Sequence, residues 1–334
     1  MTGVLRRLAG HLARGLLMIW VVLTFTFVII TIMPGDPIRA HYQELLASGV
    51  SPQEAAAQTE ALARFRPEGS LLEQYGDYLL SLFRLDFGQS MYSRVEVTTI
   101  LADATKWTVI PVLVGTLLAF GLGVAIGVFA AVKRSSKLGD FLTMTGSLLR
   151  GLPDFVIGLW LAAIFATLIP LFPRSGAVDI VAEPGFNLEF IGSLAYHAAL
   201  PILTYAISAY GGFILAMKSS VVTVLGDDFI LAAELRGMRP SIVFRYIARN
   251  AILPLFTILT LSIAAVFSGA IFIERIFNYP GLGMTLIHSI GRRDITVMAG
   301  AFFLITLAVI VANIIADMFY SVIDPRVRRA GEQT

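Results

Sequence analysis

The chain has 334 residues, of which 57% are hydrophobic and only 14% are charged, with a formal net charge of +2 and no cysteine. Soluble domains contain about 45–50% apolar and about 25% charged residues, so this composition excludes a soluble enzyme, a disordered regulator and a nucleic-acid binder. Without cysteine the chain can form no disulfide, thiolate metal site or cysteine nucleophile. A mean hydropathy of +0.79 is typical of a chain surrounded mostly by lipid.

Six segments are apolar enough to predict membrane-spanning helices, because a helix needs about 20 apolar residues to cross a bilayer. The third segment is interrupted near Gly151-Leu152-Pro153. A signal peptide is an alternative for the first, but its apolar stretch is long and no small-residue cleavage site follows it. The segments are roughly 16–33, 108–132, 141–169, 197–217, 252–273 and 297–322.

Lysine and arginine in the connecting segments predict the orientation, because short cytoplasmic loops are enriched in them. With a cytoplasmic N-terminus, 14 of these residues lie inside and four lie in short external loops. The long external loop is discounted, since long loops cross the membrane regardless of charge. We therefore predict an all-α integral membrane protein with six transmembrane helices and both termini in the cytoplasm. Residues 1–33 form the N-terminal segment and first helix, 34–106 an external helical loop, and 107–334 a five-helix core that contains a cytoplasmic loop, 221–250.

The external loop contains two predicted helices. Ser51-Pro52-Gln53-Glu54 is a helix start, with Ser51 as the cap and Glu54 completing a capping box, and the helix is expected to reach about Arg64. A second stretch, 71–83, repeats leucine and tyrosine at helical spacing. The two helices are either a lid that shields the bundle or a docking surface for an external partner.

The cytoplasmic loop contains a short helix with clear ends. Asp227 and Asp228 favour a helix start, Gly237 can adopt the left-handed stop conformation, and Pro240 prevents continuation. A second helix, about 240–250, follows. The first helix is either a rigid peg for a groove in a partner or an interfacial helix that rests on lipid headgroups.

Six short stretches along the chain, taken together and in their order of occurrence, resemble one transporter family. Ala232-Ala233, three residues, Gly237 and then Leu253-Pro254 are similar to the EAA loop of importer-type ABC permeases, although Leu231 stands where the family has glutamate and Glu234 follows the alanines. The other stretches, similar to the peptide-permease branch, are 34–37, 85–90, 274–283, 293–294 and 320–326. Over essentially its whole length the chain resembles the B-type permease subunit of a dipeptide/oligopeptide ABC importer. It departs from the family at 64–70, where a Leu-Gly-Leu-type stop is usual.

The resemblance implies a type I ABC importer permease fold in the inner membrane, with a large external loop after the first helix. It implies three kinds of protein partner in addition to membrane lipid: a second permease of similar fold, two P-loop ATPase subunits and an external solute-binding protein, with no nucleic acid. The chain has no G-x-x-x-x-G-K-[ST] motif. We therefore expect a non-catalytic subunit that binds no cofactor, with ATP and Mg on the partner ATPases.

Site residues fall into three groups. The expected ATPase-coupling residues are Leu231, Ala232, Ala233, Glu234, Gly237 and Met238. Polar groups inside spans are costly and mark cavities or pairs. The candidates for pathway lining are Arg150, Asp154, Tyr205 and Ser208. For Arg150 and Asp154, which are at i,i+4 around the break, an internal ion pair is the favoured interpretation and pathway lining the alternative. The expected external docking or gate residues are Asp86, Glu274, Pro280, Gly281 and Gly283.

Two further residue types support structure more than chemistry. The four histidines are scattered, so no metal site is expected, and His197 beside the fourth span is expected to be an interfacial residue. Gly123 and Gly127 in the second span permit close helix approach.

The leading interpretation is a permease subunit of an ATP-driven importer for di- or oligopeptides. Oligosaccharide, nickel chelate or glutathione are alternative cargoes for the same machinery. A secondary transporter or channel would favour paired charges at mid-membrane and an internal repeat, and neither is clear in this sequence. A purely structural membrane subunit would not need the short cytoplasmic helix.

Overall fold

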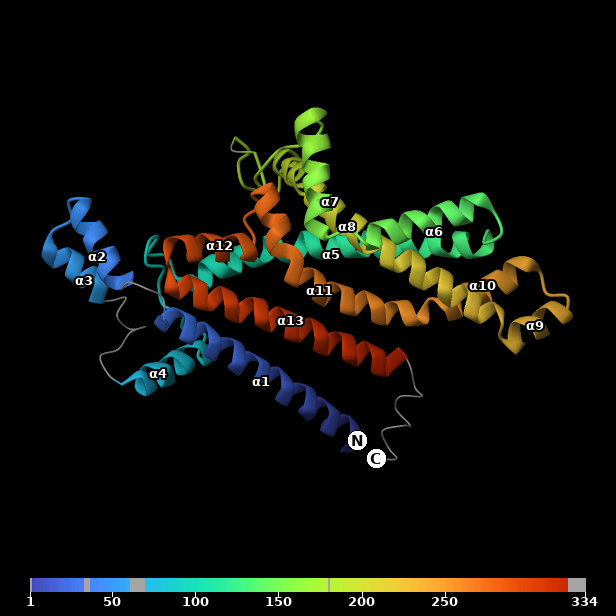
Figure 1. Ribbon diagram of the computed structural model, residues 1–334, viewed down its shortest axis with the longest axis horizontal. Helices are drawn as coiled ribbons and strands as arrows, with labels where there is room; N and C mark the ends of the chain where they lie inside the picture. Colours follow the sequence, from blue (N-terminus) through green and yellow to red (C-terminus); the bar gives the residue numbers. More distant parts are fainter. Residues whose placement is uncertain (1, 33–36, 61–69, 180, 324–334) are drawn as a thin grey trace. The chain divides into compact units, whose positions relative to one another are not determined.

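The protein is described here by a computed structural model that covers residues 2–32, 37–60, 70–179 and 181–323 (Figure 1). This described part is nearly all helical and contains no β-strand. The helices in chain order are α1 (Thr2–Ile32), α2 (Pro37–Ala47), α3 (Pro52–Glu60), α4 (Leu71–Phe83), α5 (Val97–Val132), α6 (Lys137–Arg150), α7 (Asp154–Leu161), the π-helix η2 (Ala162–Leu168), α8 (Leu188–Leu225), α9 (Asp228–Leu235), α10 (Pro240–Ala251), α11 (Leu253–Phe277), α12 (Leu282–Arg292) and α13 (Ile295–Ile323).

Several of these helices can cross a membrane. Within the described residues four segments are long and apolar enough: Val97–Val132, Leu188–Leu225, Pro240–Ile263 and Ile295–Ile315. The pair α6 and α7–η2 makes a fifth if it counts as one broken span, and α1 contributes a shorter apolar stretch, Ala13–Ile29. The multi-pass helical prediction is thus confirmed at the level of four or five spans, while the count of six and the side on which each end lies stay predictions.

The third predicted span is broken where the sequence indicates. Helix α6 ends at Arg150, α7 begins at Asp154, and the two axes differ by 104°. Pro153 disfavours helical geometry at the residue before it, so the chain turns between the two helices (Figure 1). The break also corrects one expectation: in the described chain Arg150 and Asp154 form no ion pair, because they belong to different helices and no longer face each other at i,i+4 spacing.

The chain divides into two compact units. Unit 1 comprises Met1–Thr108 and Pro280–Ile310, and unit 2 comprises Val109–Tyr279 and Val311–Thr334. These units group residues that pack together in space, whereas the division predicted from the sequence groups residues by membrane segments and loops.

The predicted external helices lie in unit 1. Ser51 caps α3 as expected: its Oγ accepts from the Glu54 backbone at 3.3 Å and donates to the Glu54 carboxylate at 3.0 Å. Helix α4 has the predicted bounds and begins with a capping box between Ser70 and Glu73. Helix α2 was not predicted. The predicted end of the first external helix and the 64–70 departure, apart from Ser70, lie outside the described residues, as do 34–36 and 324–326 of the family-like stretches.

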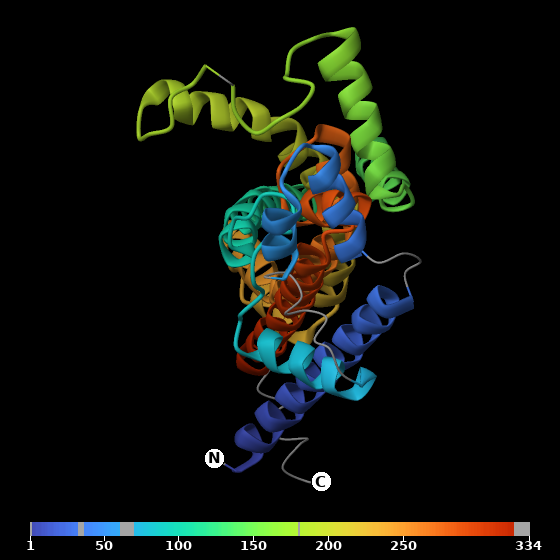
Figure 2. The same cartoon turned by 90° about the vertical axis from the view of Figure 1, so that its left-hand side faces the viewer.

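Helix α4 crosses α1 (Figure 2). Tyr78 and Leu82 form its buried side, and the rings of Tyr75 and Tyr78 lie 5.2 and 5.4 Å from that of Phe27. The Tyr75 hydroxyl is 2.5 Å from that of Thr24. Tyr75, Tyr78 and Leu82 from the predicted repeat therefore mark the buried side of α4, whereas Leu72 from the same repeat is exposed.

Two family-like stretches, 85–90 and 293–294, meet in the interior of unit 1. The Ser90 hydroxyl donates to the Asp294 carboxylate at 2.6 Å, and the other carboxylate oxygen accepts from the Thr296 hydroxyl at 2.8 Å and the Val297 backbone at 3.3 Å. Ser90, Asp294 and Thr296 are all buried. A buried carboxylate is tolerated only when donors surround it, so this network holds the 85–90 turn on the start of α13.

Helix α8 is the centre of unit 2 and contacts α6, α7, α10 and α11. Helix α5 packs against it through glycines, as predicted for Gly123 and Gly127. A Cβ added at Gly127 would lie 2.6 Å from the Cβ of Met217, and one at Gly123 would lie under 3 Å from the Cβ of Phe213. Gly121, on the same helix, has open space around it. The helices therefore touch along the glycine side of α5.

The Gly127 contact predicts an asymmetry between two substitutions on α5. Gly127→Ala should lower the free energy of unfolding by about 1–3 kcal/mol, because the new methyl group overlaps Met217. Gly121→Ala, the matched control, should leave it unchanged or raise it by up to about 1 kcal/mol. Thermal unfolding in nanodiscs measures both, and equal effects would contradict the close contact.

The Ser90 network predicts a local loss of stability. Ser90→Ala removes a hydrogen bond to a buried carboxylate and should cost about 1.5–3 kcal/mol. Ser93→Ala, at an exposed position of the same turn, should have little effect. Amide hydrogen exchange over residues 86–96 reports the change, and unchanged protection in the Ser90 variant would show that the network does not hold the turn.

Candidate functional site: helix α9 and polar groups of the bundle

The short helix of the predicted cytoplasmic loop forms with the expected ends. Helix α9 begins at Asp228 and ends at Leu235, and Gly237 has a φ of +67°. The backbone amides of Gly237 and Met238 donate to the carbonyls of Glu234 and Ala233, which closes the last turn. Helix α10, Pro240–Ala251, follows as predicted. These ends form locally, because the acidic start, the left-handed glycine and the following proline act on neighbouring residues only.

Helix α9 is anchored in a buried apolar cluster. Ile230 and Ala233 are its buried side chains. Their cluster joins α9 to α10 and to the ends of α5, α8 and α11; its other buried members are Val128, Ala131, Met217, Val221, Val224, Val243, Ile247, Ala251 and Leu255. The Ser220 hydroxyl donates to the Ala251 carbonyl at 2.7 Å and ties α8 to the end of α10. Figure 1 shows α9 and α10 at the end of unit 2 distant from α7.

The rest of the α9 surface is exposed and mostly apolar. Leu231, Ala232 and Glu234 are exposed, as coupling residues must be. Leu235 is 80% exposed and Phe229 is exposed as well, although neither was among the predicted coupling residues. The three-residue spacing of the apolar residues Phe229, Ala232 and Leu235 along the helix could have predicted them as further contact residues.

Two of the predicted coupling residues do not belong to this exposed side. Ala233 is buried in the cluster, and Met238 is partly buried and packs against it. Position 233 follows Ile230 by three residues, so both lie on the side that faces the bundle. Ala233 therefore anchors the loop and has no surface for a partner, while Met238 divides its surface between the cluster and the exterior, so the six predicted coupling residues do not form one exposed set.

Three polar residues predicted from the sequence meet inside unit 2. Tyr205 on α8 is buried and lies within electrostatic range of the carboxylates of Asp154 on α7 and Glu274 on α11. The Ser208 hydroxyl, also on α8, is buried and lies close to the Asp154 carboxylate. Arg150, at the end of α6, is exposed. The structure therefore groups Asp154 and Tyr205, adds Glu274 to them, and separates Arg150.

Glu274 and the residues that follow it differ in exposure. Glu274 is only 2% exposed, which leaves it little surface for docking, so its gate role stays a prediction. Tyr279 follows α11; burial and the nearby Glu274 carboxylate raise the pKa of Tyr279 to about 12. In unit 1, Pro280 is exposed while Gly281 and Gly283 are buried at the start of α12. The Leu282 backbone amide donates to the Thr108 hydroxyl at 2.8 Å, so this turn is held within the unit.

Asp86 is an exposed residue of unit 1, as a docking residue must be. Its carboxylate accepts from the Gly88 backbone at 3.2 Å. It lines a hollow of about 490 Å³ together with His41, Arg94 and Glu96. In the described residues no group of three or more histidine, aspartate or glutamate side chains converges as metal ligands would.

Comparison with known proteins finds one matching family and several similar transport proteins. Residues 123–329 match the family of binding-protein-dependent transport system inner membrane components. The dipeptide transport system permease protein of Escherichia coli is 32% identical over 323 residues, which cover 91% of this chain and 93% of the relative. The di/tripeptide transport system permease protein of Pseudomonas aeruginosa is 31% identical, with 91% and 93% covered. The glutathione transport system permease protein of Salmonella typhimurium is 31% identical, with 97% and 98% covered.

The match covers well over half of the chain, and these relatives are all named as transport system permease proteins. The resemblance found in the sequence motifs is thereby confirmed, and the apolar helices agree with a multi-pass protein of the inner membrane. The chain belongs to the family of binding-protein-dependent transport system inner membrane components.

Proposed function

We propose that the chain forms half of the translocation pathway of an ATP-driven importer of di- or oligopeptides. The observation that carries this proposal is α9, which combines an exposed apolar side with a buried anchor in the bundle. Exposed apolar side chains gathered on one helix are typical of an interaction site. In a binding-protein-dependent transport component, the occupant that this helix fits is an ATPase subunit.

The proposed topology has six spans and both termini in the cytoplasm. Helix α1 is the first span, and the bent pair of α6 and α7–η2 is the third. The distribution of lysine and arginine supports this orientation. It places α9 and α10 in the cytoplasm and gives the chain the type I importer permease fold.

Coupling would pass through the buried cluster under α9. Two ATPase subunits that bind ATP and Mg would move α9 when they close, and a second permease of similar fold would form the other half of the pathway. The cluster contacts α8 through Val221 and Val224, α5 through Val128 and α11 through Leu255. Protein interiors are close-packed and transmit displacement, so movement of α9 would tilt these three helices.

The cargo proposal rests on the relatives. Two of them are named for dipeptide and di/tripeptide transport, and a third is named for glutathione. Among the alternative cargoes, glutathione is therefore the one supported by the name of a relative. An external solute-binding protein would deliver the cargo to the pathway, and its ligand would identify the cargo.

Co-purification tests the proposal and the role of α9 together. The tagged chain, solubilised mildly, should recover a second permease, P-loop ATPases and a solute-binding protein. Leu235→Glu should lower ATPase recovery at least about tenfold while the second permease remains, because it places a charge in an apolar contact. Leu72→Glu, at a position on α4 that is equally 80% exposed, is the matched control.

Two outcomes would contradict the proposal. A homo-oligomer without ATPases, found reproducibly in several detergents, would exclude the importer and favour a secondary transporter or channel. Undiminished ATPase recovery with Leu235→Glu would exclude α9 as the docking helix.

The left-handed turn after α9 predicts a second effect. Gly237→Asp should uncouple ATP hydrolysis from peptide uptake without unfolding the chain, because a side chain in the left-handed region costs about 1–2 kcal/mol. Gly226→Asp, at the other end of α9 with a φ of −87°, lacks this cost and is the control. ATP-driven uptake into proteoliposomes and ATPase rate are compared. Normal uptake by the Gly237 variant would show that the turn is not part of coupling.

A further inference from the structure

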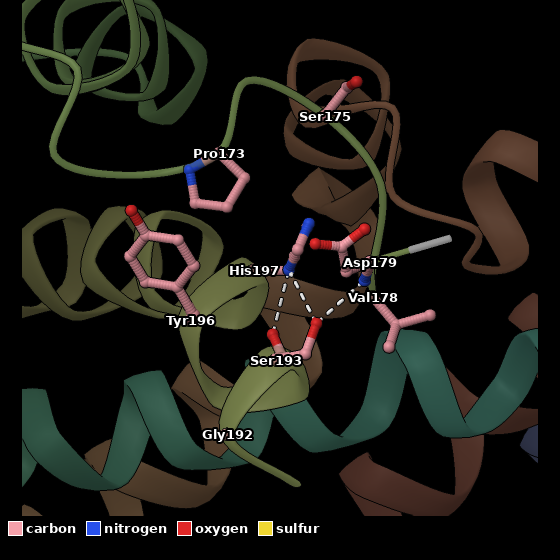
Figure 3. Close-up of a pocket in the computed structure, with 8 residues that line it drawn as sticks. All are labelled: Pro173, Ser175, Val178, Asp179, Gly192, Ser193, Tyr196 and His197. Atoms are coloured by element: carbon pink, nitrogen blue, oxygen red, sulfur yellow. Dashed lines mark hydrogen bonds between the residues drawn. The ribbon is translucent and has the colours of Figure 1, made fainter. Parts of the chain in front are cut away.

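We propose that a hollow at the start of α8 binds a lysine or arginine side chain of the external solute-binding protein. The hollow has a volume of about 710 Å³ and lies in unit 2. Its walls are the loop that follows η2 and the first turns of α8 (Figure 3); the lining residues are Pro173, Ser175, Val178, Asp179, Gly192, Ser193, Tyr196 and His197. The identity of the partner rests on the proposed function, whereas the chemistry of the hollow does not.

The loop that forms one wall is fixed in place. The Tyr196 hydroxyl donates to the Leu171 carbonyl at 2.8 Å, and the Asp179 backbone amide donates to the Ser193 hydroxyl at 2.8 Å. The Gly176 amide donates to the Phe277 carbonyl at the end of α11. The hollow is therefore preformed, which lowers the entropic cost of binding.

The hydrogen bonds of His197 determine what its ring offers to a ligand. Nδ1 lies 2.9 Å from the Ser193 carbonyl oxygen and 3.5 Å from the Ser193 hydroxyl (Figure 3). A carbonyl oxygen only accepts, so Nδ1 carries the hydrogen. In the neutral ring Nε2 is then an acceptor. His197 thus presents an acceptor in a hollow that also contains the Asp179 carboxylate.

No cation within the described chain neutralises Asp179. Its carboxylate accepts weakly from the Val181 backbone amide at 3.4 Å and forms no ion pair there. Arg174, the one basic residue of the loop, instead donates through Nε to the Ala166 carbonyl at 3.1 Å. Asp179, Glu183 and Glu189 make the segment acidic. A carboxylate beside an imidazole acceptor favours a ligand that is positively charged and rich in N–H donors.

The surroundings of the hollow favour a protein as the carrier of that cation. Val181, Phe186 and Leu188 are almost fully exposed around the loop. Exposed apolar side chains beside a polar anchor are typical of a protein interface. A small cation in solution would gain nothing from these apolar neighbours.

The length of α8 places the hollow on the side opposite α9. The helix has 38 residues, with Pro201 inside it, and measures about 55 Å along its axis at 1.5 Å per residue. That length exceeds the full thickness of a bilayer, about 40–45 Å. If α9 meets the ATPases, the hollow therefore faces the external partner.

The test follows the imidazole signal of His197 in the intact transporter in nanodiscs. The chain has only four histidines, so ¹⁵N-histidine labelling gives a readable spectrum, and His197→Gln assigns the signal. The probe is N-acetyl-arginine amide, and its uncharged analogue N-acetyl-citrulline amide is the control. We expect a saturable shift with the arginine probe and none with citrulline.

Two variants separate the hollow from the general charge of the loop. Asp179→Asn keeps the shape and should weaken probe binding about tenfold or more, because a charge-assisted hydrogen bond is lost. Glu183→Gln removes the same charge from the same loop outside the hollow and should change binding less than about twofold. Equal responses to the two probes, or equal effects of the two variants, would overturn the proposal.

The source of the cation is tested with the solute-binding protein that co-purifies. Its addition should shift the same His197 signal, and saturating arginine probe should weaken its docking. Docking that leaves the signal unchanged, or broadening of the signal by spin-labelled lipid, would overturn the proposal and in the second case assign the loop to the membrane. Normal ATP-driven uptake with a failed probe result would contradict the binding hollow and leave the proposed function intact. A positive probe result without uptake would support the binding hollow and contradict the proposed function.

Discussion

Close approach to α8 is the constraint on which unit 2 depends. Helices that touch α8 backbone to backbone need residues without a Cβ at the contact, and α5 supplies Gly123 and Gly127 there while α6 supplies Gly146 opposite Gly211. In lipid the hydrophobic effect does not drive helices together, so such close van der Waals contact is the main source of cohesion. The same central helix carries the hollow at its first turn and leads directly into α9 after its last turn.

Helix α9 depends on its contacts with the long helices of unit 2. The helix has only eight residues and would not be stable alone. Its order comes from Ile230 and Ala233, which are buried in the cluster shared with α5, α8, α10 and α11. A short helix held in this way can present Leu231 and Leu235 to a partner and still pass force to the long helices beneath it.

Polar groups inside unit 2 gather where the third span breaks. The break before Asp154 turns the chain and separates it from Arg150, so Asp154 shares its surroundings with Tyr205 and Glu274 on other helices. Polar groups are costly in lipid unless they are paired or line a cavity. The grouping excludes the ion pair that the spacing also allowed, while a role of Asp154 and Tyr205 in lining the pathway stays a prediction.

The sequence by itself determined the features that depend on near neighbours. The capped start of α3, the bounds of α4, the break at Gly151–Pro153 and both ends of α9 follow from local capping, turn and spacing rules, and all are found where predicted. The family is equally a property of the sequence, because its motifs run along most of the chain.

Only the tertiary structure decided which residues far apart in the chain meet. It paired Ser90 with Asp294 across 204 positions, buried Ala233 while leaving Phe229 and Leu235 exposed, and built the hollow around His197 from a loop and a helix start. The physical reason is that spacing along one helix defines its sides but not which side faces a neighbour. That choice is made by the packing of all helices together.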